Sequence, residues 1–332
     1  MASGGSVLTS SAVCFAVVCC VVRAGPVEVA ALVYAALVVA GVVLHVSAGP
    51  IRDEPPFWGT PTTPLDECEE NFALTPLVGE LWSAAADLVV LGVALAGWRW
   101  AWRGAVRRNG GTGATAEARL LFGALAFAGA CSLVYHTTLS ADAMVWDVVS
   151  VAWLALLLVW VARAHTQCRV NPVARAAPLR ASAWPLLLPR PDGLSVVGFA
   201  TFSALGFMEL PEQLIIYPCV SWAAVCVLWL VRPFLGQQRC GSAAAVAVRR
   251  LLVRSAMLAL LALACLIVDR IRCDEQTRPL RLHAWWHALS ACSVHALITL
   301  CCLVIESERA AWKAAAVGGG LGVNVILDKS RA

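Results

Sequence analysis

The chain has 332 residues, of which 60% are hydrophobic and only 14% are charged, and its mean hydropathy is +0.76. Soluble proteins carry about 25% charged residues, so this composition excludes a soluble enzyme and indicates an integral membrane protein. The formal net charge of +4 gives no reason to expect a nucleic-acid partner, because the basic residues are divided unevenly between loops. We therefore expect the lipid bilayer, and not nucleic acid, around this chain.

Two apolar stretches, 7–22 and 27–48, open the sequence. The first has the length of a signal-peptide core, but it lacks an early positive charge and a run of spanning length follows at once. We interpret residues 1–50 as an N-terminal apolar extension that forms one or two additional transmembrane helices. A cleaved or interfacial leader is the alternative.

Seven further apolar runs are long enough to span a bilayer, which takes about 20 residues each. They lie at 77–98, 119–139, 144–165, 193–210, 213–235, 246–269 and 283–305. No run alternates like a barrel strand, and a spanning segment must satisfy its own backbone hydrogen bonds. The sequence therefore predicts an all-α polytopic membrane protein, with a seven-helix bundle in residues 51–306 and a cytosolic tail in residues 307–332.

The distribution of arginine predicts how this bundle is oriented. We define side A as the side on which the segment 66–80 enters the first of the seven helices, and side B as the opposite side. The arginines in the side-B loops are Arg99, Arg103, Arg107 and Arg108, then Arg169, Arg175, Arg180 and Arg190, then Arg232, Arg239, Arg249 and Arg250. By the positive-inside rule side B is cytosolic. Side A then faces a lumen or the exterior.

Three histidines lie at the side-A ends of these predicted helices. His283 and His287 are spaced i, i+4, so both imidazoles project from one helical face. His136 ends another helix at the level where the His283 helix begins. Three protein ligands with one open position are typical of a catalytic zinc, whereas four ligands usually close a structural zinc. The other histidines in apolar segments are expected only to bridge helices through hydrogen bonds: His45, His165 and His295.

Two further polar residues lie at the same level. Ser132 precedes His136 by one helical turn; it is either a donor to a developing oxyanion or a serine that bonds its own helix backbone. Asp147 begins the next helix on side A, where a carboxylate suits a general base or a partner that orients a histidine. As a carboxylate at a helix entrance, Asp147 could instead serve only the helix dipole.

An acidic cluster precedes the first of the seven helices. Its oxygen-bearing residues are Asp66, Glu67, Glu69, Asn71 and Glu80. Carboxylate, amide and backbone oxygens at this density suit calcium, which takes six to eight oxygen ligands. The spacing is not that of an EF-hand, and a solvated acidic loop is the alternative, although Glu80 lies in the helix entrance and needs a partner.

Together these blocks resemble a known family. They occur in the order Asp66-Glu-Cys-Glu-Glu-Asn71, Glu80-Leu-Trp82, Ser132-x-x-x-His136, Asp147 and His283-Ala-Trp-Trp-His287. In this order they are similar to the alkaline ceramidases, seven-helix zinc amidases related to the adiponectin and progestin receptors. The resemblance covers about residues 57–306.

The resemblance implies particular ligands and roles. It implies zinc on His136, His283 and His287, with Ser132 and Asp147 as catalytic residues. It implies calcium on Asp66, the backbone carbonyl of Glu67, Glu69, Asn71 and Glu80. It also points to a disulfide between Cys68 and Cys273, which by the helix count are the core cysteines in side-A loops, where an oxidising lumen would let them pair.

The chain departs from the pattern of this family at a few positions. Glu67 stands where the family usually has Trp, which should matter little for a carbonyl ligand. Asp87 stands where it usually has Asn, so an additional acid here could perturb helix packing or the site. The extension before residue 50 has no counterpart in the core family pattern.

The resemblance leads to a prediction of function. We expect a zinc-dependent amidase that hydrolyses ceramide, or a related N-acyl sphingoid lipid, to a sphingoid base and a fatty acid. The membrane would be that of the endoplasmic reticulum or Golgi, with the active site toward the lumen. An adiponectin-receptor-type receptor is one alternative, although the acidic block is a ceramidase feature. A metal or proton transporter is another, although the repeated halves and broken helices typical of transporters are not evident.

Overall fold

The computed structural model describes residues 55–63, 68–107, 114–170, 224, 227–228, 231–232 and 243–318. Regular structure in these residues is entirely helical: α3 (Leu81–Arg107), α4 (Ala114–Thr138), α5 (Ala141–Val170), α9 (Ala243–Ile271), the 3-10 helix η2 (Arg278–Leu280) and α10 (Leu282–Gly318). Five of these helices are long and apolar enough to cross a membrane. The all-α prediction is therefore confirmed for the described part of the chain.

Five predicted helices correspond to α3, α4, α5, α9 and α10. The predicted helices at 7–22, 27–48 and 193–210, and most of the one at 213–235, lie outside the described residues. The seven-helix count therefore stays a prediction. α10 continues past the predicted end at 305 as far as Gly318, because residues 306–316 are rich in strong helix formers such as alanine and glutamate and a run of glycines follows.

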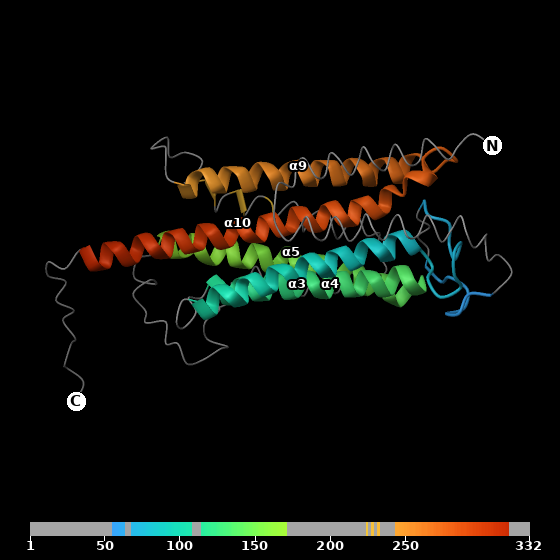
Figure 1. Ribbon diagram of the computed structural model, residues 1–332, viewed down its shortest axis with the longest axis horizontal. Coiled ribbons are helices and arrows are strands. Elements are labelled where there is room, and N and C mark those ends of the chain that lie inside the picture. The colour runs from blue at the N-terminus through green and yellow to red at the C-terminus, as the bar shows by residue number, and fades with distance from the viewer. Residues whose placement is uncertain are drawn as a thin grey trace, which may run out of the picture.

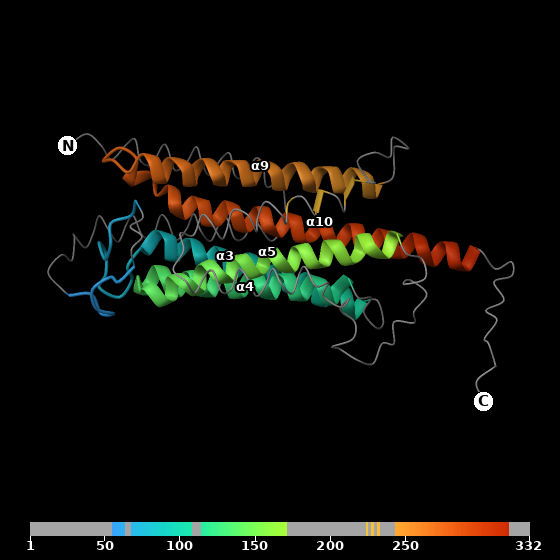
Figure 2. The ribbon, with the colours of Figure 1, turned by 180° about the vertical axis from the view of Figure 1, so that it is seen from behind.

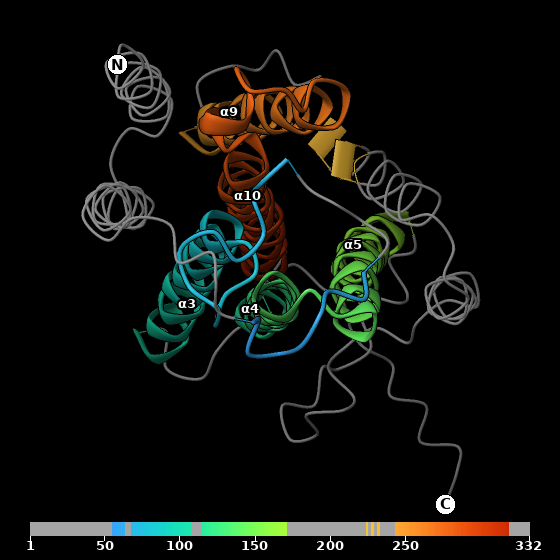
Figure 3. The same cartoon turned by 90° about the vertical axis from the view of Figure 1, so that its right-hand side faces the viewer.

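The long helices lie side by side with their axes roughly parallel, as Figure 1 and the reverse view in Figure 2 show. α3, α5 and α10 begin at one end of the bundle, and α4 and α9 finish there, so this end corresponds to side A. Seen from this end, α10 lies between α9 and the pair α3 and α4, and it packs against all three (Figure 3). The central position of α10 matters because α10 carries two of the candidate ligands.

The described parts of the 55–80 loop, residues 55–63 and 68–80, close the side-A end of the bundle over the last turn of α4. The backbone N–H groups of Thr62 and Thr63 donate to the carbonyl of Leu139 at 3.1 and 3.2 Å. Those of Gly79 and Glu80 donate to the carbonyls of Thr137 at 3.0 Å and His136 at 2.8 Å. These donors satisfy carbonyls that a helix end would otherwise leave without intrahelical partners. The loop thereby fixes the backbone that carries His136.

Small residues let the helices approach closely. A Cβ on Gly79 would lie 2.5 Å from Cγ of Leu139, and a Cβ on Gly97 would overlap the ring of Phe122. Between α9 and α10, Ser255 and Ser293 exchange hydrogen bonds, each hydroxyl donating to the other residue's backbone carbonyl at 3.1 and 2.9 Å. Close packing and interhelical hydrogen bonds of this kind drive helix association in lipid, where the hydrophobic effect between helices is absent.

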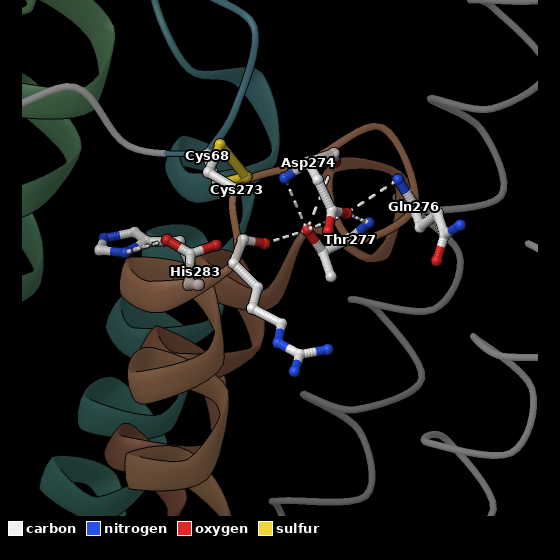
Figure 4. Close-up of a disulfide and its surroundings, with 8 residues drawn as sticks. Cys68, Cys273, Asp274, Gln276, Thr277 and His283 are labelled. Atoms are coloured by element: carbon white, nitrogen blue, oxygen red, sulfur yellow. Dashed lines mark hydrogen bonds and ion pairs between the residues drawn. A yellow bond between two sulfur atoms is a disulfide. The ribbon is translucent and has the colours of Figure 1, made fainter.

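A disulfide ties the 55–80 loop to the connection between α9 and α10. It joins Cys68 to Cys273 across 205 residues of sequence, with the Cα atoms 5.3 Å apart (Figure 4). The connection is itself ordered by Asp274, whose carboxylate accepts hydrogen bonds from the backbone N–H groups of Gln276 and Thr277. The structure thus contains the disulfide that the sequence indicates, and it holds the segment that leads into His283.

Candidate metal centre

Three histidines from two helices meet at the side-A end of the bundle. His136 lies in the last turn of α4, and His283 and His287 lie in the first two turns of α10. One potential ligand atom from each ring lies within 4.8 Å of the other two, and the Nε2 atoms of His283 and His287 are 3.0 Å apart. His136 and His283 are buried and His287 is nearly so. The i, i+4 pair and the histidine at the end of α4 thus form one cluster.

Each of these histidines has a carboxylate beside its Nδ1 atom. Oε2 of Glu80 lies 2.5 Å from Nδ1 of His136, Oδ1 of Asp87 lies 3.0 Å from Nδ1 of His287, and Oδ2 of Asp269 lies 3.7 Å from Nδ1 of His283. Only the Glu80 contact is a hydrogen bond, whereas those of Asp87 and Asp269 are close approaches of an acid to a ring nitrogen. A carboxylate on the Nδ1 side leaves Nε2 as the atom that a ring offers to a metal. The arrangement is the carboxylate–histidine–metal pattern found around protein zinc.

Sequence reasoning missed two of these partners and assigned the third differently. Glu80 was expected to bind calcium, and Asp87 was noted only as an additional acid. A signal was present for α3, because Glu80 and Asp87 are seven residues apart and such residues share one helical face. For Asp269 the sequence offered only an acidic residue at the end of an apolar helix.

The donor set fits zinc. Zinc binds imidazole nitrogen at about 2.0–2.1 Å, and tetrahedral geometry then separates two such nitrogens by about 3.3 Å. The ligand atoms here lie between 3.0 Å and 4.8 Å apart, so small side-chain adjustments bring them to that spacing. Among the described residues the cluster contains three protein ligands, which leaves one position for a water or a substrate.

The hydroxyl of Ser132 is placed differently from other hydroxyls of α4. The side chain is 4% exposed, and its Oγ has no hydrogen-bond partner among the described residues. By contrast, the hydroxyls of Thr137 and Thr138 donate to carbonyls one turn earlier, at 2.6 and 2.9 Å. The alternative in which Ser132 bonds its own helix backbone is therefore wrong for this structure. A buried hydroxyl without a partner is a donor available to a bound molecule.

Asp147 lies in the second turn of α5 and is half-buried. Its carboxylate is close enough to the Cys131 thiol to interact with it electrostatically, and Cys131 is the neighbour of Ser132 in α4. Its backbone carbonyl accepts a hydrogen bond from Ser150 at 2.7 Å. The structure thus brings Asp147 within electrostatic range of Cys131, the residue before Ser132.

The acidic cluster is only partly described, because Asp66 and Glu67 lie outside the described residues. The Glu69 carboxylate accepts hydrogen bonds from the backbone N–H groups of Trp82 at 2.6 Å and Ser83 at 3.0 Å, and so caps the first turn of α3. Burial raises the pKa of Glu69 to about 7, although the Trp82 N–H opposes the rise. Asn71 is exposed. Calcium binding here stays a prediction, since helix capping accounts for the Glu69 contacts.

The other histidines take no part in the cluster as far as the structure describes them. His295 lies deeper in α10, where its ring packs against Phe122 with centroids 5.3 Å apart. The side chain of His165, on α5, and the whole of His45 lie outside the described residues. His295 therefore offers a matched control for the ligand histidines, because it belongs to the same helix.

Fold and site together define a class: a helical protein with apolar helices of spanning length and a buried three-histidine centre at one end of the bundle. The Ceramidase family model matches residues 59–316, and the chain belongs to this family. No curated protein matches the chain. The matched region contains α3, α4, α5 and α9 and nearly all of α10, and so includes every residue of the candidate centre. Family membership supports a hydrolase that acts on ceramide.

Proposed function

We propose that this protein is a zinc-dependent amidase that hydrolyses the amide bond of ceramide or a related N-acyl sphingoid lipid, releasing a sphingoid base and a fatty acid. The observation that carries the proposal is the buried cluster of His136, His283 and His287, whose potential ligand atoms lie within 4.8 Å of one another. Zinc, when bound, supplies Lewis acidity toward the amide carbonyl and lowers the pKa of a water. The lipid substrate follows from membership of the ceramidase family.

The chain's own residues supply the remaining functions of an amidase. We propose that Asp147 takes a proton from the attacking water and returns it to the amine nitrogen as the C–N bond breaks. Ser132 would donate a hydrogen bond to the carbonyl oxygen as negative charge develops on it. Two observations support these roles: Asp147 interacts electrostatically with Cys131, the residue before Ser132, and the Ser132 hydroxyl has no hydrogen-bond partner among the described residues.

We further propose that side A faces the lumen of the endoplasmic reticulum or Golgi and that the C-terminus is cytosolic. The disulfide between Cys68 and Cys273 supports this orientation, because disulfides persist in oxidising compartments and are rare in the cytosol. A site within helices of spanning length also suits a substrate whose two chains are lipid, because the lipid can approach laterally without being extracted into water.

The proposal is tested by assaying the purified full chain, in detergent, for fatty acid release from ceramide. We expect hydrolysis, its loss after treatment with a zinc chelator, and its recovery when zinc is added back. Bound zinc without hydrolysis would favour a receptor of the adiponectin-receptor type. Transport of zinc or protons by reconstituted vesicles, again without hydrolysis, would favour the transporter alternative and overturn the proposal.

The role of Ser132 leads to a separate prediction. Ser132→Ala should lower kcat by about 10²–10³, the usual cost of removing one oxyanion donor, while zinc content stays that of the wild type. Thr137→Val is the matched control, because it removes an α4 hydroxyl that donates to the Leu133 carbonyl. Steady-state kinetics on both variants provide the measurement. A kcat equal to that of the wild type in Ser132→Ala would refute the proposed role.

For the acidic cluster we retain the proposal of a calcium site that includes Asp66, the Glu67 carbonyl, Glu69, Asn71 and Glu80. The proposal rests on the resemblance and on the density of oxygen-bearing residues that precede α3. Asn71→Ala and Glu69→Gln should weaken calcium binding, measured by titration calorimetry on the full chain. Glu70→Gln, next to Glu69 but exposed, should leave it unchanged. Absence of calcium binding by the wild type would leave the solvated-loop alternative.

A further inference from the structure

We propose that Glu80, Asp87 and Asp269 are positioning residues of the metal centre, each holding one histidine with its proton on Nδ1 so that all three Nε2 atoms are available to the metal. The inference rests on the proposed function, because it takes the histidine cluster to be the zinc site. It goes further by giving a role to three acidic side chains that the proposed hydrolysis does not use as acid, base or oxyanion donor. It also gives Glu80 a role beside His136 that is separate from calcium.

The three carboxylates come from different parts of the fold. Glu80 directly precedes α3 and is joined to His136 twice, through the 2.5 Å side-chain contact and through a backbone hydrogen bond of 2.8 Å. Asp87 lies almost two turns into α3, and Asp269 lies near the end of α9. Packing of α3 and of α9 against α10 therefore brings Asp87 and Asp269 to their rings, whereas the hydrogen bond to the last turn of α4 places Glu80.

Burial makes the contact of Asp87 with His287 the most informative of the three. Asp87 is 0% exposed, and neither carboxylate oxygen accepts a hydrogen bond among the described residues. A buried carboxylate without a partner is costly, so it needs a donor or a cation close by. Nδ1 of His287, 3.0 Å from Oδ1, is the polar atom placed to provide that donor. The packing of α3 against α10 thus holds Asp87 next to the His287 ring, and without Asp87 the orientation of that ring would lose this support.

The charges of the cluster point the same way. Glu80, Asp87 and Asp269 place three buried acidic side chains around the histidine rings. Acidic groups at these distances favour a divalent cation through their field as well as through ring orientation. The contacts lengthen from 2.5 Å for Glu80 to 3.7 Å for Asp269, so we expect Asp269 to contribute least.

The test compares Asp87→Leu and Asp87→Asn, which keep the number and branching of the side-chain heavy atoms of Asp but differ in what they offer to Nδ1. Leucine offers no acceptor, whereas the asparagine oxygen still accepts a hydrogen bond without carrying charge. Zinc affinity of the purified full chain in detergent is measured by competition with a chromophoric chelator. We expect Asp87→Leu to weaken zinc binding about 10–100-fold, the usual effect of losing such a partner, and Asp87→Asn to recover part of that loss.

Glu117→Gln is the matched control. Glu117 is also a buried acid, at 4% exposure, but it lies near the start of α4, about 28 Å along the helix from His136 at 1.5 Å per residue. Zinc affinity in this variant should equal that of the wild type. Thermal unfolding of the zinc-free proteins shows whether each variant folds, and if Asp87→Leu does not, the comparison of Asp87→Asn with Glu117→Gln decides.

The outcomes separate this inference from the proposed function. Wild-type affinity in every Asp87 variant that folds would overturn the positioning role and leave ceramide hydrolysis untouched. Equal weakening in Asp87→Asn and Glu117→Gln would overturn it as well, because the effect would then belong to any lost buried charge. Conversely, weakened zinc binding in the Asp87 variants of a protein that does not hydrolyse ceramide would uphold the positioning role and refute the amidase.

Discussion

Replacing His136, His283 or His287 with alanine should abolish ceramide hydrolysis and remove zinc from the protein. Each substitution takes away one of three protein ligands in the described cluster. Two histidines would hold the ion far more weakly, since protein zinc sites usually need at least three protein ligands. We expect zinc content to fall from about one ion per chain to near zero, as measured by elemental analysis of the purified protein, and fatty acid release to fall to background.

His295→Ala is the control for this experiment. His295 lies in α10 with two of the ligands, but its ring packs on Phe122 and takes no part in the cluster. This variant should keep its zinc and its hydrolysis. A purified wild-type protein that hydrolyses ceramide without bound zinc would contradict the mechanism, and so would a ligand variant that remains active.

Breaking the disulfide between Cys68 and Cys273 should produce the second large effect, this time on stability. The bond closes a loop of 205 residues, and the chain-entropy model gives about 5 kcal/mol for a loop of that length, a figure that measured values often fall below. We expect the double variant Cys68→Ser, Cys273→Ser to unfold at a clearly lower temperature than the wild type in the same detergent. Hydrolysis should also fall, because the bond anchors the connection that leads into His283.

Cys292→Ala is the matched control, because Cys292 is a free and buried cysteine of α10. A reducing agent should lower the unfolding temperature of the wild type and of Cys292→Ala, but should not change that of the double variant. Peptide mapping under non-reducing conditions identifies the bond directly. Finding both thiols free in native protein would contradict the disulfide and remove the support it gives to a luminal side A.

The sequence alone determined which segments form the described helices. A span must bury about 20 apolar residues and satisfy its own backbone, so hydropathy gives α3, α4, α5, α9 and α10 to within several residues at most ends. Because successive spans cross in opposite directions, the order of the predicted helices also placed the starts of α3, α5 and α10 and the ends of α4 and α9 on one side, as the structure has them. The largest difference, the extension of α10 to Gly318, follows from helix propensity and not from hydropathy.

The candidate ligands could also be recognised from the sequence, because they have unusual chemistry for their surroundings. Histidine, serine and aspartate are costly in apolar segments, so His136, His283 and His287 stood out, and the i, i+4 spacing put two of them on one face. The pairing of Cys68 with Cys273 could be predicted for a similar reason, because few cysteines lie in side-A loops. In each case, residue type and position relative to the predicted helix ends were enough to single out the candidates.

Only the tertiary structure decided which acid faces which histidine. A helix in lipid is apolar on most of its circumference, so its sequence has no polar stripe that fixes its rotation about its axis. That rotation determines whether Asp87 faces His287 and whether Asp269 faces His283. For Glu80 the deciding feature is the hydrogen bonding of the 55–80 loop to the last turn of α4, which brings its carboxylate to His136. Each of these contacts joins residues on different segments of the chain. Helix packing and the closure of the loop over α4 therefore determine which residues meet.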